Sequence, residues 1–287
     1  MIPLLLSIAS SSLIFVIFKL FKKFNIDTFQ AIVFNYAMAF VLGMSLYGHQ
    51  WNNHYLNESD WMMAALGAGI LFISLFFLMG KSSQLNGVAS TSVAVKMSMA
   101  ASLLAMIVIF GKPLGLFNGS GIILAILGVF LVSYSKSAKV NSSWMLIVLF
   151  LGSGLLDFLI FVVQDNLLHG LPDSIFTAVG LGTAGVFGFV ILSIQWMLKK
   201  RKFAWKNVIA GMILGIPNYF SIYLLMVSYK STGWNDITVL SITNVSVVVS
   251  SALIGFLAFR EKAGPRKVVG LISAIFAIGL LYYSNTH

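Results

Sequence analysis

The sequence predicts an all-α membrane protein in which ten transmembrane helices form two inverted five-helix repeats. Of its 287 residues, 59% are hydrophobic and only 9% are charged, whereas a soluble domain carries about 25% charged residues. Its apolar segments are about twenty residues long, which is the length that a helix needs to cross the hydrocarbon core. Strands of a membrane barrel would instead give alternating segments of about ten residues. A third observation is an internal repeat at an offset of 149 positions.

The apolar segments are separated by charged residues or by Gly, Asn and Pro. We expect ten helices in order, over residues 3–21, 28–47, 61–80, 88–110, 114–135, 143–163, 173–197, 205–228, 236–258 and 267–284. The first segment is followed, not preceded, by basic residues, which is typical of a retained helix and not of a cleaved leader. Apart from the polar stretch 49–60 the connections are short, so we expect no soluble domain.

Positive charge is concentrated in alternate loops. Fifteen of the eighteen Lys and Arg residues lie in or at the edges of the loops that follow the first, third, fifth, seventh and ninth helices. They are Lys19, Lys22, Lys23, Lys81, Lys136, Lys139, Lys199, Lys200, Arg201, Lys202, Lys206, Arg260, Lys262, Arg266 and Lys267. The positive-inside rule places these loops in the cytoplasm and both termini outside, in a multi-pass protein of the plasma (inner) membrane. The same bias explains the net charge of +10 without a nucleic-acid partner.

The sequence matches itself at an offset of 149 positions. The matched pairs are Lys81-Ser82 with Lys230-Ser231, Asn86 with Asn235, Ser92 with Ser241, Ser102 with Ser251, Phe110 with Phe259, Gly115 with Gly264, Gly121 with Gly270 and Tyr134-Ser135 with Tyr283-Ser284. Chance similarity between apolar segments would match Leu, Ile and Val, whereas these matches are mostly polar, Gly or aromatic. We therefore predict repeats over 1–136 and 143–287. Because five is odd, the second repeat is inverted, a topology that supports alternating access about a midplane site.

The segment around the ninth helix carries a resemblance to a known family. It reads Ser250-Ser251-Ala252-Leu253-Ile254-Gly255-Phe256-Leu257-Ala258-Phe259-Arg260-Glu261-Lys262, followed by Gly264 and Gly270. A small-residue helix, a Gly-Glu-Arg/Lys turn and a spaced Gly resemble the EamA-type branch of the drug/metabolite transporter superfamily. That resemblance covers the whole chain and implies ten helices in two five-helix repeats. The first half departs from the pattern, since Gly111-Lys112-Pro113 lacks the acid and the mid-helix proline often seen in the fourth and ninth helices is absent.

Two ionisable residues lie well inside predicted helices, where a charge costs about 2.5–3.5 kcal/mol. Lys96 is about 12 Å into the fourth helix at 1.5 Å per residue, which is too deep for its stem to reach the surface. It could anchor a carboxylate or phosphate, exchange a proton for substrate, or form a buried structural pair. Asp157 is about 21 Å into the sixth helix. It could pair with Lys96, couple protons to transport, or be hydrated near the outer surface.

Further polar residues are candidates for substrate binding. Asn244 lies beside the repeat-related position of Lys96, and its amide could bind substrate or form an interhelical hydrogen bond. Ser92 is one helical turn from Lys96, and Ser241 is its repeat mate.

Two polar-aromatic segments complete the candidate set. Pro217-Asn218-Tyr219 lies in the middle of the eighth helix, where proline frees a backbone carbonyl, and Asn35-Tyr36 is a similar pair in the second helix. For both segments a packing role is the alternative. The glycines at 180, 182, 185 and 188, and at 211 and 215, are expected to permit close helix packing.

The sequence lacks the residues that several functional classes require. The chain has no cysteine, and His49, His54, His169 and His287 all fall in predicted loops or at the terminus. We therefore expect no disulfide, no metal site and no cofactor. Nucleotide-binding loops and hydrolase motifs are absent, so we do not expect an enzyme or an ATP-driven pump.

These features favour a secondary transporter of small polar metabolites such as amino acids or organic acids. The resemblance to the EamA-type family implies export as the direction of transport. A single intramembrane cation favours anionic or zwitterionic cargo. A flippase for lipid or lipid-linked substrates is the alternative. An embedded enzyme or a channel fits less well, because neither paired catalytic groups nor rings of charge are present. The surrounding lipid is the only other partner expected, and the oligomeric state is left open.

Overall fold

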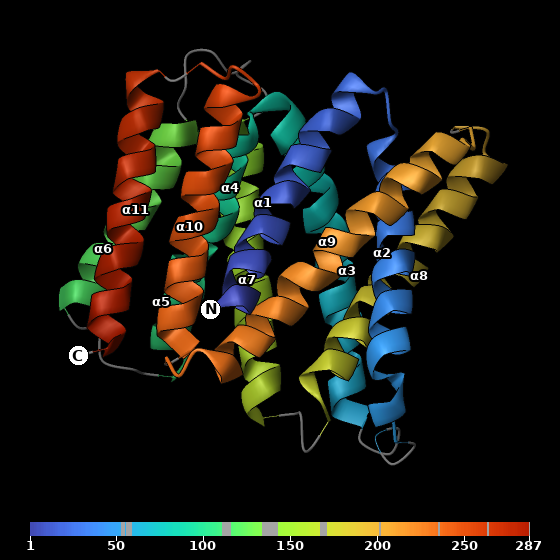
Figure 1. The fold of residues 1–287 in the computed structure, drawn as a ribbon, viewed down its shortest axis with the longest axis horizontal. Coiled ribbons are helices and arrows are strands. Elements are labelled where there is room, and N and C mark those ends of the chain that lie inside the picture. Colours follow the sequence, from blue (N-terminus) through green and yellow to red (C-terminus); the bar gives the residue numbers. More distant parts are fainter. Residues whose placement is uncertain are drawn as a thin grey trace. The chain divides into compact units, whose positions relative to one another are not determined.

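The computed structural model describes residues 1–52, 55, 59–110, 116–133, 143–166, 171–200, 202–234, 236–262 and 264–286, and these contain helices and no strand. The helices are α1 (Ile2–Lys23), α2 (Thr28–Tyr47), η1 (Gly48–Gln50), α3 (Ser59–Leu85), α4 (Val88–Lys96), α5 (Ser98–Phe110), α6 (Leu116–Ser133), α7 (Ser143–Asn166), α8 (Asp173–Met197), α9 (Trp205–Ser231), α10 (Asp236–Leu257) and α11 (Pro265–Thr286) (Figure 1). The repeat positions Gly115, Tyr134-Ser135 and Asn235, and the turn Gly111-Lys112-Pro113, lie outside the described residues.

Seven helices are long and apolar enough to cross a membrane, among the residues that the structure describes. These candidate spans are Ile2–Lys23, Thr28–Gln50, Trp61–Leu85, Ser143–Ile160, Ser174–Met197, Trp205–Tyr229 and Val239–Leu257. The protein is therefore a multi-pass helical membrane protein.

The predicted helix over 88–110 is interrupted, which the sequence pattern did not indicate. The amide of Met97 still donates to Val93 at 2.9 Å, but the amide of Ala100 donates to the Met97 carbonyl at 2.9 Å, only three residues back. The Ser98 hydroxyl lies 2.6 Å from the Val95 carbonyl. Serine side chains that bond to nearby carbonyls compete with the helical ladder. The chain is consequently divided into α4 and α5 at Met97.

The chain folds as two compact units. Unit 1 contains Met1–Leu20, Leu78–Phe158 and Ser221–His287, and unit 2 contains Phe21–Phe77 and Leu159–Phe220. Each unit thus takes helices from both predicted repeats.

In unit 1 the most extensive packing joins α6 to α11, which lie side by side in Figure 1. A Cβ on Gly128 of α6 would lie 3.1 Å from the Gly270 carbonyl oxygen of α11, so glycine is what allows these two backbones to approach. The helix α4 packs mainly on α10.

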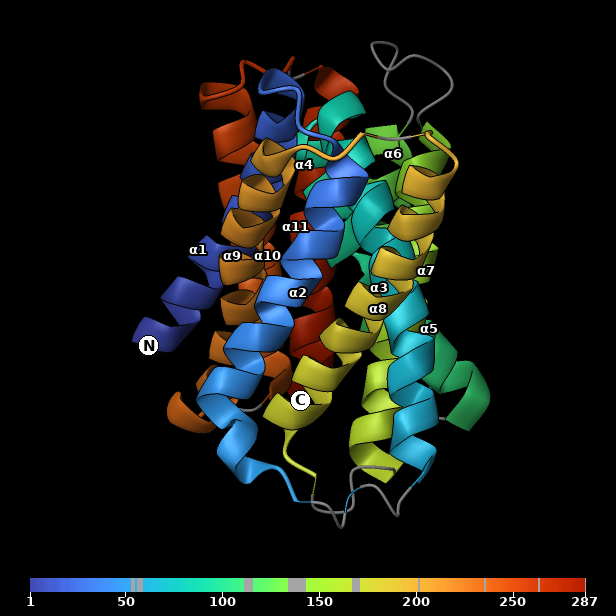
Figure 2. The same ribbon diagram turned by 90° about the vertical axis from the view of Figure 1, so that its right-hand side faces the viewer.

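In unit 2 the main packing joins α2 to α8, which are neighbours in both views (Figures 1 and 2). A Cβ on Gly182 would lie 2.7 Å from the ring of Phe40, and one on Gly188 would lie 2.8 Å from Val33. On α9, a Cβ on Gly211 would meet the Ala31 carbonyl oxygen of α2. The expectation of close packing is confirmed for Gly182, Gly188 and Gly211, whereas a Cβ on Gly180 would make only an ordinary contact, at 3.8 Å from Phe72.

Candidate functional site

Lys96 is the last residue of α4 and its side chain is partly buried. A cation at a helix C-terminus interacts favourably with the carbonyls exposed there. Lys96 also interacts electrostatically with Asp157. Within the described part of the chain it makes no hydrogen bond and no ion pair within 4.0 Å. The interruption at Met97 therefore leaves a cation inside a predicted span without a direct partner there.

Asp157 of α7 is held by α5. Its Oδ2 atom lies 2.7 Å from the Ser98 hydroxyl oxygen, which is itself 2.6 Å from the Val95 carbonyl. A hydroxyl carries one proton and can donate one good hydrogen bond at a time. An ionised Asp157 competes with the carbonyl for that proton, whereas a protonated Asp157 can donate to Ser98 while Ser98 donates to Val95. The geometry thus accommodates both protonation states of Asp157.

A glycine brings α7 close enough for this contact. Gly154 lies three residues before Asp157, and a Cβ at this position would be 2.6 Å from the Cβ of Ala101 and 3.0 Å from the Ser98 carbonyl oxygen. The absence of a side chain at Gly154 therefore sets the α5–α7 distance at which Ser98 and Asp157 meet.

The candidate residues on α10 are buried and weakly bonded. The Asn244 amide has a single, long contact to the sulfur of Met99 at 3.7 Å, and sulfur is a weak acceptor. The buried Ser241 hydroxyl has no hydrogen-bond partner among the described residues. Ser92 on the facing helix α4 bonds to its own helix at the Ala89 carbonyl, at 2.9 Å. Unit 1 therefore holds polar groups whose hydrogen-bonding capacity is incompletely used.

The other four candidates lie in unit 2. The Tyr36 hydroxyl donates to the Phe72 carbonyl at 2.7 Å, which is the structural role that the sequence left open. The amide of Asn35 is fully buried, and neither its nitrogen nor its oxygen has a partner in the described part of the chain. Asn218 and Tyr219 are buried on α9, and the Tyr219 ring occupies space left by Gly43, whose Cβ would lie 2.9 Å from it. Pro217 does not break α9, which is continuous through it.

The structure therefore divides the predicted site into two groups, each within its own unit. Unit 1 contains Lys96, Ser92, Asn244, Ser241 and Asp157 on α4, α10 and α7, and unit 2 contains Asn35, Tyr36, Asn218 and Tyr219 on α2 and α9.

Glu261 was not among the candidate site residues, yet its carboxylate joins three other groups of unit 1. Its Oε1 atom accepts the Val88 amide at 2.7 Å and lies 3.3 Å from Lys19, while its Oε2 lies 3.3 Å from Lys267. The side chain is only 7% exposed. We call Glu261, Lys19, Lys267 and the Val88 amide the Glu261 cluster.

Two glycines leave room for this carboxylate. Gly87, at φ +96°, is the N-cap of α4 and has no side chain to cap it. A Cβ there would meet the Glu261 carboxylate, and one on Gly255 would lie 3.0 Å from its Oε2. Glu261 thus caps α4 from the α10–α11 connection. In the sequence, Glu261 is a single acidic residue in a basic loop. This pattern does not indicate which residues, distant along the chain, the Glu261 side chain contacts.

A metal site has no support in the described residues, where no group of three His, Cys, Asp or Glu side chains converges.

Comparisons with known proteins found a relative in sequence and a solved structure with a similar fold. No family model matches it. It is 28% identical over 291 residues to an uncharacterized protein of Haemophilus influenzae (strain ATCC 51907 / DSM 11121 / KW20 / Rd), covering 98% of this chain and 97% of that protein. A protein crystal structure is similar with a TM-score of 0.57 and 12% identity, over 98% of this chain and 99% of that one. That likeness indicates a common fold alone.

Proposed function

We propose that this protein is a secondary transporter of small anionic or zwitterionic metabolites, of the EamA type, with ten spans in two inverted repeats. Three of the ten proposed spans are not among the seven long apolar helices: α4 with α5, α6, and α11. We count them as spans because α6 contains an apolar stretch at Gly119–Val132, because α4 and α5 together cover the predicted fourth helix, and because α11 covers the predicted tenth.

Helix packing supports the repeat. Among the described residues, α6 packs extensively on α11, α2 on α8 and α4 on α10, and each pair joins helices at equivalent places in the two predicted repeats. Shifting the first residue of α6, Leu116, by the repeat offset gives Pro265, the first residue of α11. Equivalent helices meet in this way when two repeats are related by a pseudo-two-fold axis.

The proposed function rests mainly on the unused hydrogen-bond donors of Lys96. A lysine within the membrane region, at a helix interruption, with no hydrogen bond in the described structure, retains three donors for a ligand. Asn244 and Ser241 on the neighbouring α10 add an amide and a hydroxyl with little other bonding. A carboxylate or phosphate bound to Lys96, with polar contacts to α10, satisfies all three. Amino acids and organic acids have this chemistry.

Asp157 can couple the binding of a proton to transport. Because the Ser98 hydroxyl can serve either protonation state of Asp157, a proton can bind there and alter the field at Lys96. In the proposed cycle the protein alternates access to a site near Lys96 and Asn244, and a proton exchanges at Asp157.

The test is uptake of labelled amino acids, organic acids and sugar phosphates into proteoliposomes, with and without a pH gradient. We expect wild type to transport at least one anionic or zwitterionic class, and Lys96→Met to lose that transport while it remains folded. Lys81→Gln removes an exposed lysine of the same unit and serves as the control. Asp157→Asn should retain counterflow but lose dependence on the pH gradient.

Two outcomes would refute this function. If Lys96→Met transports as well as wild type, the binding role of Lys96 is wrong. If the protein moves no soluble cargo but transfers labelled phospholipid between leaflets, the flippase alternative is correct.

A further inference from the structure

The segment 199–206, which joins α8 to α9 in unit 2, carries a dense positive charge. Five of its residues are basic and none is acidic. Arg201 lies outside the described residues, and the other four are exposed lysines. None of these lysines makes a side-chain hydrogen bond or an ion pair with any group that the structure describes. We call Lys199, Lys200, Lys202 and Lys206 the Lys199 patch.

The first lysine of the patch has a left-handed backbone, at φ +53°. The Lys199 amide donates to the Trp196 carbonyl at 3.0 Å, and the Lys200 amide donates to the Gln195 carbonyl at 2.9 Å. This pair of bonds is the Schellman motif, whose left-handed residue is usually glycine because a side chain there costs free energy. The left-handed residue after α1 is Asn25, at φ +51°, a type that tolerates this conformation. The helix α8 therefore ends on a lysine where glycine would be more stable.

A second lysine of the patch is also unfavourable for the local structure. Lys206 lies in the first turn of α9, which contains no acidic residue, although the helix dipole favours acids over cations there. Orientation in the membrane requires neither Lys199 nor Lys206, since the segment would keep three other basic residues. Residues that cost local stability are typical of functional sites. Their positions indicate a binding role for the charges of the patch.

Aromatic side chains lie between the lysines in sequence. Phe203 is 46% exposed and Trp205 is 71% exposed, and their rings are 5.3 Å apart, edge to face. Exposed tryptophans gather where the headgroups of a membrane meet water. The aromatic pair therefore places the Lys199 patch at the depth of the lipid phosphates.

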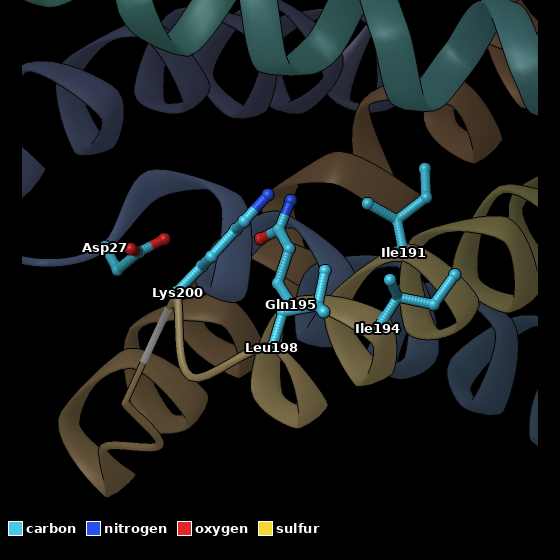
Figure 3. A pocket seen from close by; sticks show the side chains of 6 residues that line it. All are labelled: Asp27, Ile191, Ile194, Gln195, Leu198 and Lys200. Carbon is cyan, nitrogen blue, oxygen red and sulfur yellow. The ribbon is translucent and has the colours of Figure 1, made fainter.

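Aliphatic side chains of α8 adjoin the patch. Ile191, Ile194 and Leu198 are exposed and line, with Lys200, a cavity of about 490 Å³ (Figure 3). Because α8 is a candidate membrane span, these side chains face lipid tails. Figure 3 shows the Lys200 side chain between the aliphatic ones and Asp27, whose carboxylate caps α2. The patch thus has a cationic part and an apolar part next to each other.

We propose that the Lys199 patch binds the headgroups of anionic phospholipids in the leaflet on its side of the membrane. The lysines contact the lipid phosphates, and the acyl chains lie along Ile191 and Ile194. The choice of partner follows from charge and surroundings. A zwitterionic headgroup would bring an ammonium group toward several lysines, and a soluble anion would leave the aromatic and aliphatic side chains without contacts. The Lys and Arg distribution assigns this side to the cytoplasm, where the leaflet carries anionic lipid.

The test is native mass spectrometry of the full-length detergent-solubilised protein, titrated separately with phosphatidylglycerol, phosphatidylcholine and soluble glycerol phosphate. We expect phosphatidylglycerol to bind more tightly than phosphatidylcholine, by about fivefold for each lysine in contact. The triple variant Lys199→Gln, Lys200→Gln, Lys202→Gln should bind both lipids equally. The single variant Lys199→Gly should bind phosphatidylglycerol about fivefold more weakly while its melting temperature rises, because glycine relieves the backbone strain.

Arg260→Gly is the matched control. Arg260 is an exposed basic residue with a left-handed backbone, at φ +50°, but it follows α10 and lies outside the patch. Its replacement should leave the lipid preference unchanged. The proposal is overturned if wild type does not prefer phosphatidylglycerol, or if the triple variant keeps that preference. It is also overturned if Arg260→Gly and Lys199→Gly weaken binding equally, or if glycerol phosphate binds as tightly as the lipid, since the patch would then serve a soluble anion.

Discussion

The carboxylate of Glu261 accepts the backbone amide of Val88 at 2.7 Å, although the two residues are 173 positions apart. It thereby supplies the N-terminal cap that Gly87 does not provide to α4. The same carboxylate joins Lys19 of α1 and Lys267 of α11. The Glu261 cluster therefore connects the start of the helix that carries Lys96 to two other helices of unit 1.

Glu261→Gln should destabilise the protein. Glutamine can still accept from Val88, but Lys267, whose side chain is 9% exposed, loses its counter-charge. Removing one partner of a buried ion pair costs about 3–5 kcal/mol, and the greater exposure of Lys19 reduces this to about 2–4 kcal/mol. Thermal unfolding in detergent measures the effect.

The adjacent Lys262→Gln is a control for the Glu261 prediction, because Lys262 is exposed. In the double variant Glu261→Gln, Lys267→Met the buried cation is also removed, so part of the lost stability should return. A melting temperature of Glu261→Gln equal to that of wild type would show that the cluster contributes nothing to stability.

Gly154→Ala should separate α7 from α5. The added methyl would lie 2.6 Å from Ala101 and 3.0 Å from the backbone of Ser98, and overpacking of this kind costs about 1–3 kcal/mol. Gly279→Ala is the control, since a Cβ at that position of α11 meets no atom within 4 Å. Alanine's better helix propensity should make the control neutral or slightly stabilising. A Gly154→Ala protein as stable as Gly279→Ala would contradict the close approach.

Ser98 and Asp157 should be energetically coupled. In a double-mutant cycle of Ser98→Ala and Asp157→Ala, we expect a coupling energy of about 1–2 kcal/mol, because each single variant removes one side of their 2.7 Å contact. Chemical unfolding of the four proteins measures this. Strictly additive effects would mean that the contact does not stabilise the fold, and would remove the basis for assigning Asp157 a switching role.

Local patterns predicted most of the fold. The expected ranges 28–47 and 173–197 coincide with α2 and α8, because hydrophobicity and the residues that begin and end a helix are local features of the sequence. No Gly or Pro near Met97 indicates the helix interruption there. The interruption depends on the hydrogen bond of the Ser98 hydroxyl to the Val95 carbonyl. The sequence suggested the individual site residues but not their division between two units, nor the partners of Glu261, because both depend on tertiary packing.

Asn35→Leu should stabilise the protein and impair its function. Both ends of this fully buried amide lack hydrogen-bond partners in the described structure, and an unsatisfied buried polar group costs about 1–3 kcal/mol. Leucine has a similar size and removes that cost, so the melting temperature should rise while proteoliposome transport falls. A more stable variant with unchanged transport would exclude Asn35 from the binding residues, and a less stable one would show that its amide has an unrecognised partner.

The orientation can be read with single cysteines, because the native chain has none. Asn52 and Lys202 are exposed and lie in loops that the Lys and Arg distribution assigns to opposite sides of the membrane. In intact cells, a membrane-impermeant maleimide should label Asn52→Cys and should label Lys202→Cys only after permeabilisation. The reverse pattern would invert the topology and place the Glu261 cluster outside. Labelling of both positions in intact cells would mean that the number of spans between them is even, which contradicts the five proposed crossings.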